Sequence, residues 1–355
     1  MLHESLFIRA VASYLPSAVP VGNAIADGKY GRAEQAESGI EGITVAGPGE
    51  SGPAMAVQAG RRAVRRSGLA GRDIDLLLHT VTAHNGLDGW NAGCYLQKEV
   101  LDGGGLSVEV RQLSNGAMAC VELAAAYLTA RPACRGALIT AAEQFAEPAW
   151  DRWRTSWGLV FADGASAAVL SREAGFARVC STVTVADPDL EGLHRGLEPF
   201  TGAPGSGNYP ISLRARALDF ARSMDPAEVG RRLATGLRTA VFLAAAEAGM
   251  SVEQADHYVV PSYGKKLLRR ECLEPLAIPV GRSTWSWSAG VGHLGAADQF
   301  AALTHLAEGG RLAAGNKVLV IGIGGGFNWS CMVLDIVERP AGDCWAAQDR
   351  AEFGR

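Results

Sequence analysis

The sequence predicts an α/β protein made of two tandem units that share one order of elements. Apolar runs alternate with helical patterns along the chain, which is typical of α/β domains. Hydrophobic residues form 48% and charged residues 20% of the 355 residues, so the chain can bury a large core. The repeat divides the chain into a first half, 1–175, and a second half, 176–355.

The repeat is a helical pattern followed by an apolar strand, present twice about 180 residues apart. The first copy has a helix over Ala54–Ser67 and a strand that starts at Asp73. The second copy has a helix over Val229–Ala248 and a strand that starts at Ala255. Chance similarity of two α/β segments is the alternative, and agreement at further strands argues against it. Those further strands and closing β-rich segments start at Gly136 and Gly164, and again at Asn316 and Phe327.

The bulk composition excludes several classes of protein. A net charge of −4 and a pI of about 6.0 do not predict a nucleic-acid surface. Seven cysteines without CxxC spacing predict neither a disulfide framework nor a zinc site, so no metal is expected. The N-terminal residues lack a signal-peptide pattern, and no apolar run reaches the roughly 18 residues of a membrane span. We therefore expect a cytoplasmic protein.

A candidate nucleophile is Cys120. VEVRQL, from Val108, predicts a buried strand, SNGAM predicts a tight turn, and Cys120 is expected to begin an apolar helix that runs to Ala130. Unpaired N–H groups and the helix dipole would favour its thiolate. The alternative is a buried structural cysteine. That alternative is expected for the other internal cysteines, Cys94, Cys134, Cys180, Cys272 and Cys331.

The segment NGAMACVEL around Cys120 resembles the nucleophile turn of the β-ketoacyl-ACP synthase III family, in the thiolase superfamily. Four more segments resemble that family in order and spacing, so the resemblance covers essentially the whole chain. It implies a thiolase fold, in which two α/β halves form five αβαβα layers, and a homodimer. The four segments start at Phe161 (FADGASAAVL), Val259 (VVPSYGKKL), Ser288 (SAGVGHLGAAD) and Ile323 (IGGGFNWSCMVL).

The sequence departs from the family where condensing members carry a His and an Asn that promote decarboxylation of a malonyl thioester. Ser262 stands in the place of that His, and His293 in the place of that Asn. A serine cannot replace an imidazole of tunable pKa. One imidazole suffices for a Cys–His transferase, and Asp298, five residues later, is a candidate to orient it. The alternatives are a core histidine for His293 and a charge that complements the helix dipole for Asp298.

The resemblance also implies where an oxyanion and the substrates bind. The backbone amides of Cys120 and Gly325 are expected to form the oxyanion hole, although Gly325 is equally explained by a turn. Trp90 and His84 are expected to line an acyl pocket, with loop packing as the alternative. Lys266, in the run KKLLRR, could meet a phosphate or an acidic carrier protein, or form a solvated helix face.

The expected activity is acyl transfer in natural-product biosynthesis, from a phosphopantetheine thioester through a Cys120 acyl-enzyme to a hydroxyl, amine or thiol acceptor such as a sugar or polyketide. No cofactor is expected. The donor is an acyl carrier protein or acyl-CoA; Glu37 and Glu41, where CoA-binding members carry an Arg-bearing segment, favour the carrier protein. The alternatives are a decarboxylating condensing enzyme and a catalytically silent subunit of a heterodimer.

Overall fold

The chain forms a layered α/β structure, seen in a computed structural model that describes residues 1–203, 205–341 and 345. Cys344, one of the seven cysteines, lies outside the described residues. Among those described, nine strands form one hydrogen-bonded series in the order β5-β4-β6-β7-β1-β8-β11-β10-β9. Their bounds are β1 Phe7–Tyr14, β4 Ile74–Thr80, β5 Leu106–Val110, β6 Gly136–Glu143, β7 Gly164–Ser171, β8 Ala177–Ala186, β9 His257–Val259, β10 Lys317–Gly324 and β11 Asn328–Ile336.

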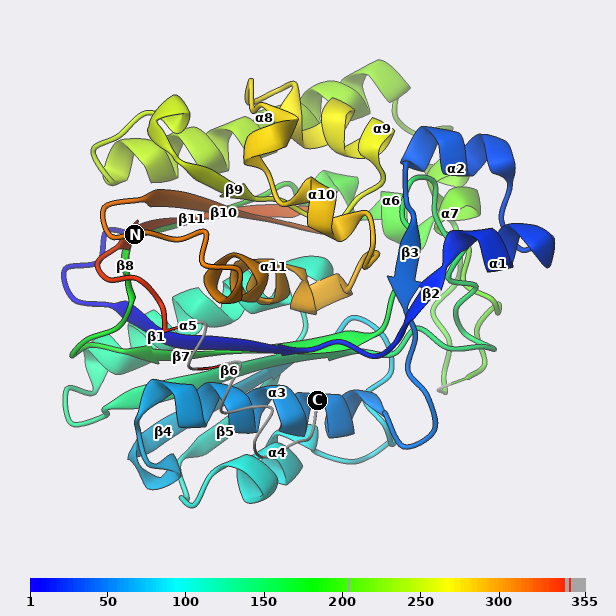
Figure 1. Cartoon of the computed structure of the whole chain (residues 1–355). Helices are drawn as coiled ribbons and strands as arrows, with labels where there is room; N and C mark the ends of the chain where they lie inside the picture. The colour runs from blue at the N-terminus through cyan, green and yellow to red at the C-terminus, as the bar shows by residue number, and fades with distance from the viewer. Residues whose placement is uncertain (204, 342–344, 346–355) are drawn as a thin grey trace.

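Helices separate and cover the strands in five layers (Figure 1). Helices α5 and α11 lie between the strands of the first half and those of the second half, while α3 with α4 and α8 with α9 cover the outer faces. This arrangement confirms the predicted five-layered thiolase fold. The bounds are α3 Gly52–Ser67, α4 Ala92–Val100, α5 Gly116–Ala130, α8 Pro226–Glu247, α9 Lys265–Leu268 and α11 Asp298–Glu308.

The remaining elements are short strands and short helices. β2 and β3 form a separate two-stranded sheet. Their bounds, with those of the short helices, are β2 Ala18–Pro20, β3 Gly42–Thr44, α1 Val21–Ala26, α2 Arg32–Ser38, α6 Gly192–Arg195, α7 Leu213–Phe220 and α10 Trp285–Ser288.

The two halves repeat one strand order. The series β4-β6-β7-β1 in the first half matches β9-β10-β11-β8 in the second, and the predicted repeat helices are α3 and α8. The first half adds β5 beside β4, whereas in the same place the second half has the single parallel bridge between Tyr258 and Ser283. The predicted boundary between 175 and 176 falls between β7 and β8, and it stays a prediction.

Helix α5 is buried because its sequence is apolar and small. Four alanines and Gly116 in its first ten residues allow close packing, and its side chains join a core that includes residues of both halves. No helix in the described part of the chain combines the length and apolarity that a membrane span requires.

Two local predictions were wrong. Strand β5 is partly exposed because it is the edge of the sheet. Helix α5 begins at Gly116, so Cys120 is its fifth residue and does not begin it.

Candidate active site

Ser114 lies at the sharp turn between β5 and α5. Its neighbour Leu113 has φ of 47°, a left-handed conformation that is uncommon for a residue with a side chain. Gly116 permits the turn to approach β4, since a Cβ there would lie 1.9 Å from Thr80 Oγ1. Ser114 is half-buried, so its hydroxyl sits at the edge of the core. A strained strand-to-helix turn of this kind presents a nucleophile in other enzymes.

Ser114, His293 and Asp298 form a continuous hydrogen-bonded chain. Ser114 Oγ lies 2.9 Å from His293 Nε2, and His293 Nδ1 lies 2.7 Å from Asp298 Oδ2. A carboxylate only accepts hydrogen bonds, so Nδ1 carries the proton and Nε2 is left to accept from the serine hydroxyl. These are the contacts of a nucleophile, a general base and an orienting carboxylate.

The backbone and two aromatic rings hold His293 in place. Its N–H donates to Val160 O at 2.8 Å, and Ala162 N–H donates to His293 O at 2.9 Å. The rings of Phe161 and Tyr263 meet the imidazole edge-on, with centroids 5.6 and 5.8 Å away. The side chain is almost fully buried. These contacts fix the position of His293, and its Nε2 faces Ser114 Oγ.

Asp298, the first residue of α11, is held by backbone N–H groups from the loop before this helix and from the segment after β9. Leu294 N–H donates to its Oδ1 at 2.8 Å, and Ser262 N–H donates to its Oδ2 at 3.0 Å. Together with His293, these donors satisfy a carboxylate that is almost fully buried. The contact predicted between His293 and Asp298 is thus present. The helix-start position that gave the alternative interpretation is present as well.

Cys120 lies in a different environment from the one predicted. It is fully buried in the apolar core between the two sets of strands. Burial strongly raises the pKa of its thiol, whereas the sequence analysis expected a lowered pKa. The environment predicted for Cys120 was therefore wrong. The structure brings Ser114 to His293 instead, and Ser114 lies between β5 and α5, directly after the predicted strand VEVRQL.

Ser262 lies beside the hydrogen-bonded chain of Ser114, His293 and Asp298, but its side chain does not extend it. Its backbone N–H reaches Asp298, while its hydroxyl lies 3.3 Å from Ser288 Oγ and is buried. The side chain is therefore engaged within the core.

The turn of Gly324–Gly326 lies beside the nucleophile turn. Asn115, next to Ser114, donates from Nδ2 to Asn328 Oδ1 at 2.7 Å and to Ser330 Oγ at 2.8 Å. A Cβ on Gly324 would lie 2.7 Å from Asn115 Cβ, so only glycine allows this approach. Gly325 packs against His194, whose Nδ1 would be 1.6 Å from an added Cβ. Asn115 thus connects the turn of Ser114 to the turn that contains Gly325, one of the two amides that the resemblance assigns to the oxyanion hole.

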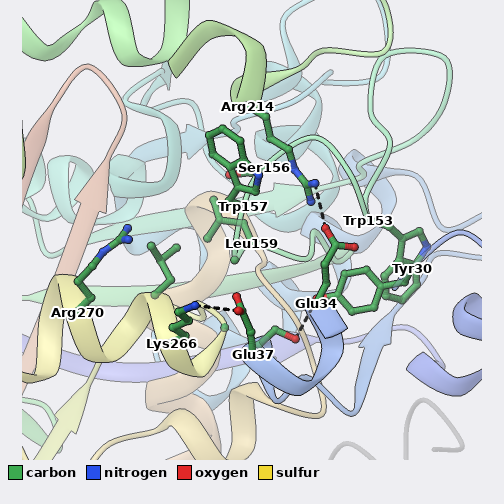
Figure 2. A pocket seen from close by; sticks show the side chains of 14 residues that line it. Tyr30, Glu34, Glu37, Trp153, Ser156, Trp157, Leu159, Arg214, Lys266 and Arg270 are labelled. Carbon is green, nitrogen blue, oxygen red and sulfur yellow. Dashed lines mark hydrogen bonds and ion pairs between the residues drawn. The ribbon is translucent and has the colours of Figure 1, made fainter. Parts of the chain in front are cut away.

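A cavity of about 200 Å³ has on its wall residues that neighbour the contacts of His293 in the sequence (Figure 2). Gly158 and Leu159, on its wall, directly precede Val160, which accepts the hydrogen bond from His293. Gly264, also on the wall, follows Tyr263, whose ring contacts His293. Lys266 lines this cavity, as do Trp153 and Trp157.

A second cavity, of about 400 Å³, contains the other predicted substrate residues. His84 and Trp90 line it with Trp150 and Arg111. Trp150 packs against Phe161, the same ring that contacts His293. The structure therefore gathers His84 and Trp90 at one cavity on the far side of Phe161, apart from Lys266.

Buried Glu143 joins the loop of this second cavity to the loop of His293. Its carboxylate accepts from Thr82 N and Ala83 N at 2.7 and 3.0 Å and from Ala296 N at 3.0 Å. Burial raises its pKa to about 7 against the effect of these donors. The sequence analysis missed Glu143, whose surroundings arise only from tertiary contacts.

Two family models match the chain. The 3-oxoacyl-[acyl-carrier-protein (ACP)] synthase III model matches residues 108–188, and the model of its C-terminal part matches residues 245–336. A β-ketoacyl-[acyl-carrier-protein] synthase III of Rhizobium meliloti (strain 1021) is 28% identical over 300 residues, which are 84% of this chain and 88% of that protein.

Solved structures agree with these matches. The acyltransferase ChlB3 superposes with a TM-score of 0.89 and 34% identity over 95% of this chain and 99% of its own. The priming β-ketosynthase from the R1128 polyketide biosynthetic pathway superposes with a TM-score of 0.76 and 21% identity over 95% and 97% of the two chains, which is a likeness of fold. Motifs, fold and whole-length similarity agree, and the chain belongs to the 3-oxoacyl-ACP synthase III family of thiolase-fold enzymes.

Proposed function

We propose that this protein is an acyltransferase that uses Ser114, not Cys120, as its nucleophile, and that it transfers an acyl group without decarboxylation. The observation that carries the proposal is the hydrogen-bonded chain from Ser114 through His293 to Asp298. A serine is a weak nucleophile by itself and becomes reactive when an oriented imidazole can take its proton.

In the first half-reaction, Ser114 Oγ attacks the carbonyl carbon of the acyl thioester while its proton passes to His293 Nε2. The tetrahedral intermediate collapses by breaking the carbon–sulfur bond, and the imidazolium returns the proton to the thiolate that leaves. The products are a Ser114 ester and a free thiol. Asp298 stabilises the imidazolium without taking its proton.

In the second half-reaction, an acceptor hydroxyl, amine or thiol replaces the departed thiol. His293 takes the acceptor's proton as the acceptor attacks the ester carbonyl, and then returns it to Ser114 Oγ as the carbon–oxygen bond breaks. A sugar or a polyketide is an acceptor of suitable chemistry. The cavity of His84 and Trp90 is a candidate for the acyl group or the acceptor.

Backbone N–H groups are the proposed oxyanion donors. The start of α5 presents unpaired N–H groups and the positive end of its dipole close to Ser114. The turn of Gly324–Gly326, with Gly325 as the earlier candidate, lies next to Asn115 on the other side. Cys120 is the fifth residue of α5, so its amide belongs to the hydrogen-bonded body of the helix and is not proposed as a donor.

Two observations favour this function over its rivals. The hydroxyl of Ser262 is buried against Ser288 and offers no imidazole for a decarboxylating carbanion, which disfavours a condensing enzyme. The assembled contacts around Ser114 disfavour a catalytically silent subunit.

Proteins of this family carry names that refer to an acyl carrier protein, and we propose a carrier-protein or CoA thioester as donor, with the cavity of Figure 2 as its route. A homodimer in the cytoplasm is part of the same proposal.

Mass spectrometry of the intact protein after incubation with acyl thioesters tests the proposal. We expect an acyl adduct that maps to Ser114 and that survives neutral hydroxylamine, as an oxygen ester does and a thioester does not. A hydroxylamine-labile adduct on Cys120 would contradict the serine assignment. Release of carbon dioxide from a malonyl thioester, with a β-keto product, would favour the condensing enzyme.

A further inference from the structure

The rim of the cavity in Figure 2 carries its charges as ion pairs. Arg214 reaches Glu34 with 3.0 Å between Nη1 and Oε1, and Lys266 Nζ lies 2.8 Å from Glu37 Oε1. Arg270, the remaining cation on the rim, lies 2.6 Å from Glu271 Oε1. Each basic side chain of the rim therefore has a carboxylate at hydrogen-bond distance.

These pairs contribute little to the fold. The side chains of Lys266 and Glu37 are 67% and 62% exposed, and those of Arg214 and Glu34 are 23% and 41% exposed. Ion pairs with this much solvent contact typically stabilise a protein by only about 0–1 kcal/mol. Their larger effect is on the electrostatic potential at the rim, because each carboxylate cancels the field of the cation beside it.

The wall behind the rim is aromatic and uncharged. Tyr30 and Trp153 pack with ring centroids 5.3 Å apart, and Trp157 lies under the guanidinium of Arg214. The tyrosine hydroxyl donates to Ser38 Oγ at 2.9 Å. A slender, mostly neutral thioester arm suits such a wall, whereas a polyanionic group at the rim would need unpaired cations.

We infer that the Glu34–Arg214 and Glu37–Lys266 pairs make the rim selective for a carrier-protein thioester over free acyl-CoA. The inference rests on the proposed function, in which this cavity admits the donor. Both donors share the pantetheine arm with its first phosphate, and CoA adds a further backbone phosphate and a 3′-phosphate. A rim whose cations are already paired gives those extra phosphates no compensation.

The test is the binding of CoA to protein in which Ser114→Ala removes the proposed nucleophile. Adding Glu34→Gln and Glu37→Gln frees Arg214 and Lys266, and we expect CoA to bind about tenfold more tightly at low ionic strength, with most of the gain lost in high salt. 4′-Phosphopantetheine, which lacks the extra phosphates, should gain about twofold or less. Isothermal titration calorimetry measures both probes.

A matched control changes net charge equally at a distance. Glu99→Gln with Glu228→Gln also frees two exposed arginines, Arg61 and Arg231, away from the cavity. An equal gain in the control, an equal gain for 4′-phosphopantetheine, or no gain for CoA would overturn the inference. If the double variant fails to fold, Glu37→Gln alone, at the more exposed pair, should still give a smaller gain with the same salt dependence.

The result separates this inference from the proposed chemistry, because binding is measured without a nucleophile. A tenfold gain in CoA affinity without any acyl adduct in the parent protein would support the role of the paired rim charges and reject the Ser114 acyl-enzyme. An adduct on Ser114 without the gain in CoA affinity would do the reverse.

Discussion

The turn before α5 and the second turn of that helix place two potential nucleophiles, Ser114 and Cys120, in opposite surroundings. Ser114 is half-buried, follows a strained residue and contacts an oriented imidazole. Cys120, six positions later, is fully buried among apolar side chains that raise the pKa of its thiol. The intrinsically better nucleophile thus sits where burial opposes its ionisation.

Under the proposed function, position at the turn outweighs the chemistry of the side chain. A thiol needs a donor, a nearby positive charge or solvent to become a thiolate, and the core provides none of these. A hydroxyl with a base at 2.9 Å needs no shift in its own pKa, because the proton leaves during attack.

Removing each of the two side chains in turn gives the largest expected difference in effect. Ser114→Ala should lower kcat by about 10⁴-fold or more, since the nucleophile is absent. Cys120→Ala should leave kcat within about twofold and lower the free energy of unfolding by about 1–2 kcal/mol through a small cavity. Steady-state transfer assays and denaturant unfolding measure the two quantities. Full activity in Ser114→Ala would reject the comparison.

Asp298 tests whether the nucleophile turn depends on an oriented imidazole. Asp298→Asn keeps the shape but allows the wrong tautomer of His293, so kcat should fall about 10³–10⁴-fold with folding largely intact. Asp335→Asn, which removes a carboxylate that contacts Arg178 on the strands β8 and β11, is the matched control and should leave kcat nearly unchanged. Equal losses in both variants would indicate a general effect of stability.

Asn115 sharpens the comparison because its side chain ties the turn of Ser114 to β11. Asn115→Ala removes the donors to Asn328 and Ser330, and we expect kcat to fall about 10–100-fold and stability by about 2–3 kcal/mol. The control is Thr184→Val, which breaks the 2.6 Å contact to the same Ser330 without touching the turn. It should lose stability while kcat stays close to that of the parent protein.

The fold was predictable because its signals are local and repeated. The helix of Ala54–Ser67 and the strand from Asp73 recur in the second half, and two copies at one offset predict two similar layers. His293 and Asp298 were found through the family resemblance of the segment SAGVGHLGAAD, in which His293 stands five residues before Asp298, the first residue of α11.

Ser114 was missed because the start of α5 depends on a tertiary contact. Gly116 reads as part of a turn in the sequence, yet it begins the helix where its missing Cβ admits Thr80 of β4. With the helix start placed four residues late, Cys120 took the position that belongs to the turn. The surroundings of Glu143 were beyond prediction for a similar reason, as its three N–H donors come from two distant loops.

Glu143 extends the comparison to a buried group that does have donors, and its effect on activity should be the smallest. Its pKa is raised from 4.5 to about 7 by burial, so the folded state holds this proton over a range where the unfolded state has lost it. The stabilisation from this group is therefore complete below pH 4.5 and is lost as pH rises through 7. Relative to Glu143→Gln, the parent protein should lose up to about 3 kcal/mol of unfolding free energy between pH 4.5 and 8.

The comparison with Glu143→Gln isolates this carboxyl from all other titrations, because both proteins share every other group. The variant should be less stable than the parent at low pH, since an amide can accept from only one side and meets N–H donors on both. Its kcat should stay within about tenfold, because Glu143 acts on His293 only through Ala296. A constant stability difference from pH 4.5 to 8 would mean that the three donors hold the carboxyl at its ordinary pKa. Hydrogen-bond donors alone would then decide whether a buried group ionises. The contrast between the turn of Ser114 and the site of Cys120 would reduce to the presence or absence of such donors.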